Sequence, residues 1–367
     1  MPPRPFQIHV PDADLEDLRG RLRRTRWPQP LDGVGWDYGA NIDYVRELCE
    51  YWSDSYDWRA QERRLNALPG FMCEVDGVDI HFWHLKSNMP GALPLLLIHG
   101  WPGSVIEFEG VIERLRSQPF DLVIPALPGF GWSGKPRERG WGISRIASAF
   151  NTLMTTELGY ARYGVQGGDW GGIISSKMAA TYPQAIAGAH LNFVIAPPPA
   201  QPSDEDRAAA AQRDLFQAAE TGYSNVQGTK PDSLTIAQSD SPAGLAAWVV
   251  EKFRTWSDCG GDVQSRFSKD ALLTNIMFYW APNSAASAAR IYFEARADPG
   301  AFRYAKVEVP TAVAVFPAEP WRVPRSWAEP RFNITRWTEM PRGGHFAAME
   351  EPELLATDIA EFFATVR

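Results

Sequence analysis

A polar residue stands between two pairs of small residues in segment 167–172, which reads Gly-Gly-Asp-Trp-Gly-Gly. The segment follows a β-like run at 163–166 and precedes a helical pattern at 173–180. Glycines around one polar side chain are typical of a nucleophile elbow, because a tight strand-to-helix turn leaves no room for β-carbons. The side chain that such a turn would expose is Asp169, although a helix N-cap aspartate in a glycine-rich turn would look the same.

An aspartate at this position favours alkylating electrophiles as substrates. A carboxylate that attacks an sp³ carbon forms an ester, and water can then attack the ester carbonyl. A serine in the same place would form an ether, which water does not readily cleave. The sequence therefore predicts an epoxide or an alkyl halide as the substrate class, and not an ester or amide.

A second segment, 99–104, reads His-Gly-Trp-Pro-Gly-Ser and follows an apolar run at 95–98. In a hydrolase built around such an elbow, one backbone N–H of the oxyanion hole comes from this early loop and the other from the residue after the nucleophile. These donors would be the backbone N–H groups of Trp101 and Trp170. We expect His99 to have a structural role.

The predicted base is His345, in the stretch Arg-Gly-Gly-His-Phe-Ala just before the last helical pattern. The order nucleophile, acid, histidine along the chain is the one expected of a hydrolase built around such an elbow. The imidazolium that His345 would form requires a carboxylate partner. Glu319 follows the strand-like run 311–316 and is the predicted partner. Glu308 and Glu329 are the alternatives.

The elements that position these residues form an alternating pattern of apolar runs and helical segments, which predicts a mainly parallel α/β sheet. The predicted strands are 80–84, 95–98, 121–125, 163–166, 189–194 and 311–316, and a last sheet-like stretch covers 333–337. Helical composition at 207–220, 245–256 and 284–297 interrupts the alternation and predicts an inserted helical lid. Ahead of the sheet, a helix within 11–27 and two more within 41–68 predict an amino-terminal helical module.

Over essentially its whole length the sequence resembles the epoxide hydrolases of the microsomal type. The resemblance rests on separated motifs: 5–8 and 24–28 near the amino terminus, 99–104, 167–172, 316–319, and 342–348 with 350–354. It implies an α/β-hydrolase fold with a mainly parallel central sheet, a helical lid and an amino-terminal helical module. The implied divisions are an amino-terminal module at 1–75, a first part of the core at 76–196, a lid at 197–305 and a second part of the core at 306–367.

The resemblance also implies two lid tyrosines, Tyr223 and Tyr292, which would donate protons to the alkoxide of an opening epoxide. The implied reaction adds water to an epoxide and gives a vicinal diol through an ester on Asp169. A haloalkane dehalogenase with the same nucleophile is the alternative enzyme, and a catalytically silent binding protein is the alternative of another class. The lid aromatics Phe278, Tyr279 and Trp280 are candidates for lining an apolar pocket.

Composition limits the possible partners. The 367 residues carry a formal net charge of −8 with a pI near 5.4, which argues against nucleic acid and anionic membranes as partners. Cys49, Cys73 and Cys259 have no metal or disulfide spacing, so we expect no metal, no cofactor and reduced thiols. No signal peptide or membrane anchor is visible, and a cytoplasmic enzyme acting on a lipophilic epoxide and water is expected. A homodimer is left open, as are the identity of the epoxide, the stereochemistry, and a detoxifying or biosynthetic role.

Overall fold

The central strand of the sheet is the most continuous apolar run in the sequence. All six residues of β4 (Leu93–Ile98) are buried in the computed structural model, which describes residues 2–303 and 305–366. A strand that is covered on both faces has no polar side, which explains the unbroken run. β4 lies between β5 (Phe120–Pro125) and β6 (Tyr163–Gly167) and is parallel to both.

In the described part of the chain the sheet has nine strands, in the order β1-β2-β3-β5-β4-β6-β7-β8-β9. In this order the first three pairings, β1-β2, β2-β3 and β3-β5, are antiparallel, and all later pairings, from β5-β4 to β8-β9, are parallel. The other strands are β1 (Arg4–Pro5), β2 (Gly70–Val75), β3 (Val78–Leu85), β7 (Ile186–Leu191), β8 (Val307–Val315) and β9 (Phe332–Glu339). The predicted mainly parallel sheet of an α/β-hydrolase is confirmed.

Three details of the sheet differ from the prediction. β1 and β2 were not expected, and both belong to the antiparallel end of the sheet. β7 ends at Leu191, three residues before the predicted end, where Gln166 on β6 donates a side-chain hydrogen bond of 2.8 Å to Asn192. The helix α6 (Asp169–Thr181) begins at Asp169 itself and not at residue 173, so the elbow leads directly into the helix.

The helices fall into three groups along the chain. Those of the amino-terminal module are α1 (Asp12–Arg23), α2 (Ile42–Asp54) and α3 (Trp58–Leu65). Those of the lid are α7 (Asp204–Glu220), α8 (Gly222–Gln227), α9 (Pro231–Asp240), α10 (Pro242–Trp256), α11 (Lys269–Trp280) and α12 (Ala285–Ala297). Those of the core, besides α6, are α4 (Glu109–Leu115), α5 (Ile143–Thr152), α13 (Arg325–Ala328), α14 (Ala347–Glu350) and α15 (Pro352–Ala364). The sequence predicted α7, α10 and α12 but not the intervening α8, α9 and α11.

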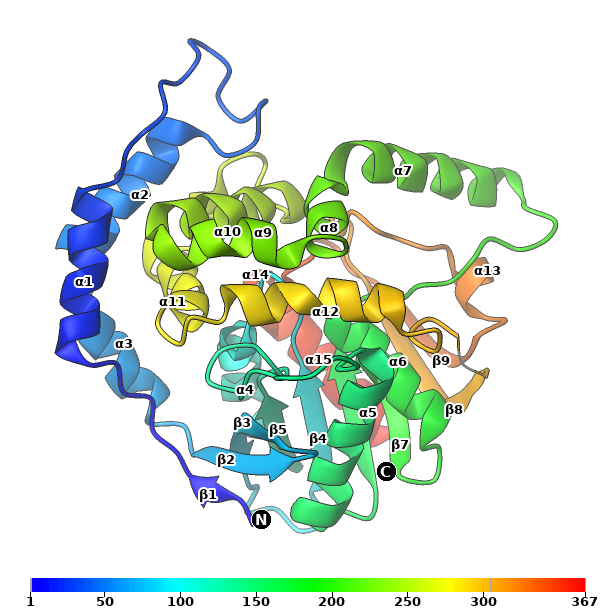
Figure 1. Cartoon of the computed structure of the whole chain (residues 1–367). Coiled ribbons are helices and arrows are strands. Elements are labelled where there is room, and N and C mark those ends of the chain that lie inside the picture. The colour runs from blue at the N-terminus through cyan, green and yellow to red at the C-terminus, as the bar shows by residue number, and fades with distance from the viewer. Residues whose placement is uncertain (1, 304, 367) are drawn as a thin grey trace.

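The amino-terminal module lies against the lid, beside α10 and α11 (Figure 1). Side-chain hydrogen bonds join the two groups of helices: the Tyr51 hydroxyl donates to Asp270 Oδ1 at 2.8 Å, and the hydroxyls of Tyr56 and Thr274 are 2.9 Å apart. The module therefore supports the lid helix α11 from outside. Within the described residues, no helix has both the length and the apolar character needed to cross a membrane.

Candidate active site

The turn between β6 and α6 places Asp169 at the carboxyl end of the parallel strands. Asp169 has φ of +47°, a left-handed conformation that is strained for a non-glycine residue. The glycines around it are required by close backbone contacts. A β-carbon at Gly167 would lie 2.3 Å from the carbonyl carbon of Gly171, and one at Gly171 would lie 1.8 Å from the Ile98 oxygen. The sequence pattern and the backbone geometry are therefore both those of a nucleophile elbow.

A backbone donor from the early loop reaches the Asp169 carboxylate. The N–H of Trp101 donates to Asp169 Oδ1 at 2.8 Å. This approach needs Gly100, because a β-carbon there would lie 2.2 Å from the same oxygen. Trp170 follows Asp169 in the first turn of α6, where backbone N–H groups have no acceptor within the helix. One oxygen of Asp169 is thus held at the site that the sequence predicted for an oxyanion hole.

The other Asp169 oxygen faces His345. Asp169 Oδ2 lies 3.6 Å from His345 Nε2, and His345 Nδ1 lies 2.8 Å from Glu319 Oε2. The His345 and Glu319 side chains are only 7% and 5% exposed. Of the alternative acids, Glu308 is an exposed residue near the start of β8, and Glu329 is exposed and forms an ion pair with Arg325. The structure therefore brings Asp169, His345 and Glu319 together.

The two carboxylates control the charge of the histidine. Burial by itself would lower the pKa of His345, but Glu319 and Asp169 oppose it and raise the pKa well above its usual range. The imidazolium form is therefore favoured while Asp169 is a free carboxylate. His99 is different, since burial lowers its pKa to about 4. Its Nδ1 lies 2.9 Å from the Gly100 carbonyl oxygen and its Nε2 accepts the Leu127 N–H at 3.1 Å, which agrees with the expected structural role.

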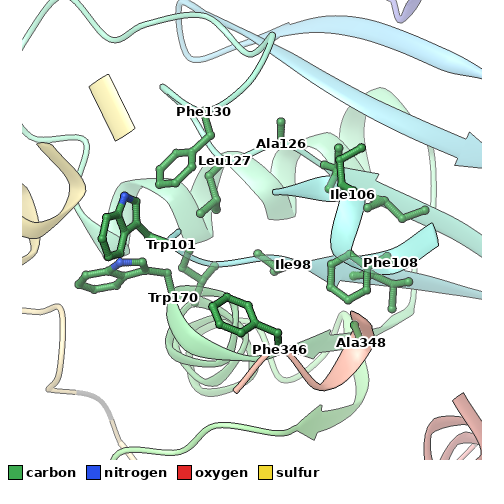
Figure 2. Packing of buried hydrophobic residues seen from close by; sticks show 14 of the residues in the cluster. Ile98, Trp101, Ile106, Phe108, Ala126, Leu127, Phe130, Trp170, Phe346 and Ala348 are labelled. Carbon is green, nitrogen blue, oxygen red and sulfur yellow. The ribbon is translucent and has the colours of Figure 1, made fainter. Parts of the chain in front are cut away.

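The lid contributes two tyrosines to an aromatic cluster above Asp169. The Tyr223 ring stacks on the Trp101 ring with centroids 5.1 Å apart, and the Tyr292 ring meets the Trp170 ring edge to face at 4.8 Å. Figure 2 shows the indoles of Trp101 and Trp170 side by side at one end of the buried cluster. Burial is the main cause that raises the pKa of both tyrosines, so both remain phenols at neutral pH. The two tyrosine rings meet edge to face with centroids 5.7 Å apart, and the Tyr292 hydroxyl interacts with the side chains of Tyr223 and Trp170, so the two phenol groups lie close together near Asp169.

The other lid aromatics have packing roles. Phe278 meets Trp132 edge to face with centroids 4.5 Å apart, and the Tyr279 hydroxyl donates to the Gly103 carbonyl oxygen. Trp280 is half-buried beneath the Arg21 guanidinium. Sequence reasoning missed Trp256, whose ring centroid lies 4.9 Å from that of Tyr223 and 5.0 Å from that of His345. Nothing in the amphipathic pattern of α10 distinguishes this tryptophan from a core residue.

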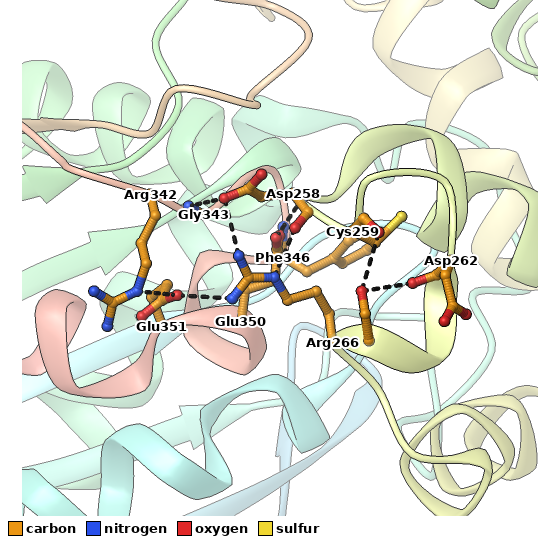
Figure 3. A network of polar contacts seen from close by, with 10 residues as sticks. Asp258, Cys259, Asp262, Arg266, Arg342, Gly343, Phe346, Glu350 and Glu351 are labelled. Carbon is orange, nitrogen blue, oxygen red and sulfur yellow. Dashed lines mark hydrogen bonds and ion pairs between the residues drawn. The ribbon is translucent and has the colours of Figure 1, made fainter.

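A polar network holds the loop that carries His345 against the lid (Figure 3). The Glu350 carboxylate accepts the backbone N–H of Asp258, from the lid, at 2.7 Å and that of Phe346 at 3.0 Å. The Asp258 carboxylate in turn accepts the Gly343 N–H at 3.0 Å, and the His345 N–H donates to the Trp256 carbonyl oxygen at 2.9 Å. Backbone groups on both sides of His345 are thus fixed by the lid.

Comparison with known proteins assigns the family. The family description "Epoxide hydrolase N terminus" matches residues 3–108, and "alpha/beta hydrolase fold" matches residues 94–239. The chain is 42% identical to a protein of Stigmatella aurantiaca described as a candidate epoxide hydrolase, over 99% of this chain and 85% of that protein. It is 35% identical to epoxide hydrolase 1 of Oryctolagus cuniculus, over 99% of this chain and 89% of the relative. The chain belongs to the microsomal epoxide hydrolase family.

Solved structures of epoxide hydrolases extend the similarity to the whole fold. The juvenile hormone epoxide hydrolase of the silkworm Bombyx mori superposes with a TM-score of 0.93 at 32% identity, covering 100% of this chain and 95% of that one. The Aspergillus niger epoxide hydrolase gives a TM-score of 0.89 at 30% identity, covering 100% and 97%. Epoxide hydrolysis, which the sequence predicted, is confirmed as the activity of the family, and the haloalkane dehalogenase alternative is not favoured.

Proposed function

We propose that this epoxide hydrolase converts a lipophilic epoxide and water to a vicinal diol through a covalent ester on Asp169. The observation that carries the proposal is the difference between the two oxygens of the Asp169 carboxylate. The Trp101 N–H donates to Oδ1, while Oδ2 faces His345 and is available to attack the substrate. The aromatic cluster above Asp169, to which the lid contributes two tyrosines, supports the proposal of an apolar substrate, because indole and phenol rings favour lipophilic carbon skeletons.

In the first step Asp169 Oδ2 attacks a ring carbon of the epoxide, and the C–O bond of the ring breaks. The ring oxygen becomes an alkoxide, which is far more basic than a phenol and takes a proton from Tyr223 or Tyr292. Their raised pKa values keep both tyrosines protonated until the ring opens. The product of this step is a hydroxyalkyl ester of Asp169.

In the second step water hydrolyses that ester. Esterification removes the negative charge of Asp169, which is one of the two carboxylates that raise the pKa of His345. The imidazolium can then lose its proton, which replaces the proton that the tyrosine gave to the alkoxide. The neutral imidazole accepts a proton from water, while Glu319 stabilises the imidazolium that forms. The N–H groups of Trp101 and Trp170 would stabilise the oxyanion on the former carbonyl oxygen, a type of contribution worth about 3–4 kcal/mol per donor.

Replacing Tyr292 with phenylalanine should slow ester formation about 10²-fold, because the general acid is lost while the ring and its packing are kept. Tyr223→Phe should have a similar effect, and the double variant should lose nearly all alkylation. Stopped-flow tryptophan fluorescence follows this step, since Trp101 and Trp170 contact the rings concerned. Tyr279→Phe, which removes a hydroxyl bonded to the Gly103 carbonyl oxygen, is the matched control. Unchanged alkylation in the double variant would remove the tyrosines from the mechanism.

Isotope labelling tests the ester itself. In a single turnover in ¹⁸O-water, with enzyme in excess, the label should enter the Asp169 carboxylate and be absent from the first diol, because water attacks the ester carbonyl and not the ring. Mass spectrometry of the peptide that contains Asp169 and of the diol gives both readings. Label in the first diol would mean direct attack of water on the epoxide.

A further inference from the structure

A small chamber lies against the Asp169 carboxylate and His345. The space open to the centre of a water molecule is about 10 Å³, which is close to what a single buried water needs. Four side chains in its wall are polar, namely those of Asp169, His345, Glu107 and Asn192, and the other side chains are mainly apolar. Figure 2 shows three of the apolar side chains, Phe108, Phe346 and Ala348, close to one another. The chamber thus has the size and polarity for one ordered water molecule.

Glu107 is the acidic group in this wall that the two chemical steps do not use. It belongs to a short 3₁₀-helix (Val105–Phe108) that follows the loop bearing Trp101. A β-carbon at Gly103 would lie 1.4 Å from Glu107 Oε1, so the glycine makes room for the carboxyl group. The Glu107 carboxyl group therefore occupies the space that a side chain at position 103 would need.

The pKa of Glu107 depends on two of the reacting groups, Asp169 and His345. Burial, with a further contribution from Asp169, raises the pKa of Glu107 to about 8, while His345 and a backbone hydrogen bond at Ser104 lower it. A carboxyl group keeps at least one acceptor oxygen whether or not it is protonated. Glu107 and Ala348 also line a surface cleft of about 390 Å³ beside α3, α4 and the start of α11, so the chamber adjoins solvent at these two residues.

We propose that this chamber holds the hydrolytic water and that Glu107 positions it by accepting a hydrogen bond from one of its two O–H groups. The inference rests on the proposed ester mechanism. The second O–H donates to His345 Nε2, which leaves a lone pair of the water oxygen to attack Cγ of Asp169. The water proton passes to His345 as the new C–O bond forms. The bond from Cγ to the substrate oxygen then breaks, and that oxygen takes the proton from His345 to give the diol. The remaining water proton, now on the Asp169 carboxyl group, passes to His345 and restores the carboxylate and the imidazolium.

Glu107 acts in this scheme only on the second step, and this separates its role from a purely structural one. The Glu107→Met variant keeps an unbranched side chain of similar length but has no strong acceptor. Glu107→Gln keeps a carbonyl oxygen at the same position. Glu113→Gln, at an exposed glutamate on the adjacent helix α4, is the matched control.

The experiment is a single turnover of a terminal aryl epoxide such as styrene oxide by the full-length enzyme. Rapid quench and mass spectrometry measure formation and decay of the Asp169 ester in the wild type and the three variants. We expect Glu107→Met to form the ester at the wild-type rate and to hydrolyse it about tenfold more slowly, which corresponds to the loss of one hydrogen bond to the attacking water. Glu107→Gln should hydrolyse it within about threefold of wild type for the same reason. In steady state kcat and KM of the Met variant should fall together, with kcat/KM unchanged.

Three results would overturn the inference. Two of them concern Glu107 alone, and the third contradicts the ester mechanism on which the inference rests. Wild-type decay of the ester in Glu107→Met would show that no water is positioned by this side chain. Equal slowing of both steps in the Met and Gln variants would indicate a structural role. The amplitude of ester formation counts the folded sites, so a folding defect cannot imitate slow decay. An absence of ester in the wild type with turnover intact would contradict the proposed function itself.

Discussion

Asp169→Ala should abolish epoxide turnover, with a loss of roughly 10⁴-fold or more, because the covalent route has no other nucleophile. The neighbouring carboxylate Glu319 is turned toward His345 Nδ1 and cannot replace it. The hydrogen-bond donor at Trp101 and the two tyrosines remain, so substrate binding should persist without ester formation. Chiral diol analysis measures the activity, and the mass of the quenched protein reports the ester.

The matched control for this variant is Asp214→Ala, at an exposed aspartate on the lid helix α7. It should show wild-type turnover. Circular dichroism and thermal unfolding show whether Asp169→Ala folds, which is needed because residue 169 has a positive φ. Diol formation at the wild-type rate by a folded Asp169→Ala enzyme would contradict the assignment of the nucleophile and reopen the possibility of another catalytic route.

His345→Gln should trap the ester. The first step needs the carboxylate of Asp169 and the tyrosines, whereas the second needs a base for water, so we expect one equivalent of alkylated enzyme and very little diol. Loss of a general base typically costs about 10²–10⁴-fold. Intact-protein mass spectrometry should show a mass increase equal to the epoxide, located on the peptide that contains Asp169.

The pH dependence of ester decay tests the same residue. A base must be neutral to act, so the wild-type decay rate should fall as the pH is lowered through the pKa that His345 has in the ester. This pKa should be lower than in the free enzyme, where the Asp169 charge contributes to raising it. His345→Gln should lack this acidic limb, and His99→Gln, if it folds, should retain it because His99 is bonded to the backbone. A wild-type decay rate in His345→Gln would exclude His345 as the base.

Local chemistry explains why parts of this site can be predicted from the sequence. The elbow at 167–172 is a continuous segment whose glycines are required by contacts of its own backbone, and the apolar run of β4 reflects burial on both faces. Strands and helices with strong patterns were predicted for the same reason. Short lid helices such as α8 have too few residues for a periodic pattern, and β1 has only two residues.

The amino-acid sequence by itself determined the nucleophile turn, the order of the chemical groups along the chain, the α/β-hydrolase class of the fold and the family. Only the tertiary structure decided which glutamate faces His345, since Glu308, Glu319 and Glu329 lie in loops or at strand ends whose directions depend on packing. It also brought Trp256 and Glu107 to the site from segments without a motif of their own. The physical reason is that a strained turn is specified by neighbouring residues, whereas the surroundings of a carboxyl group are specified by residues distant in the chain.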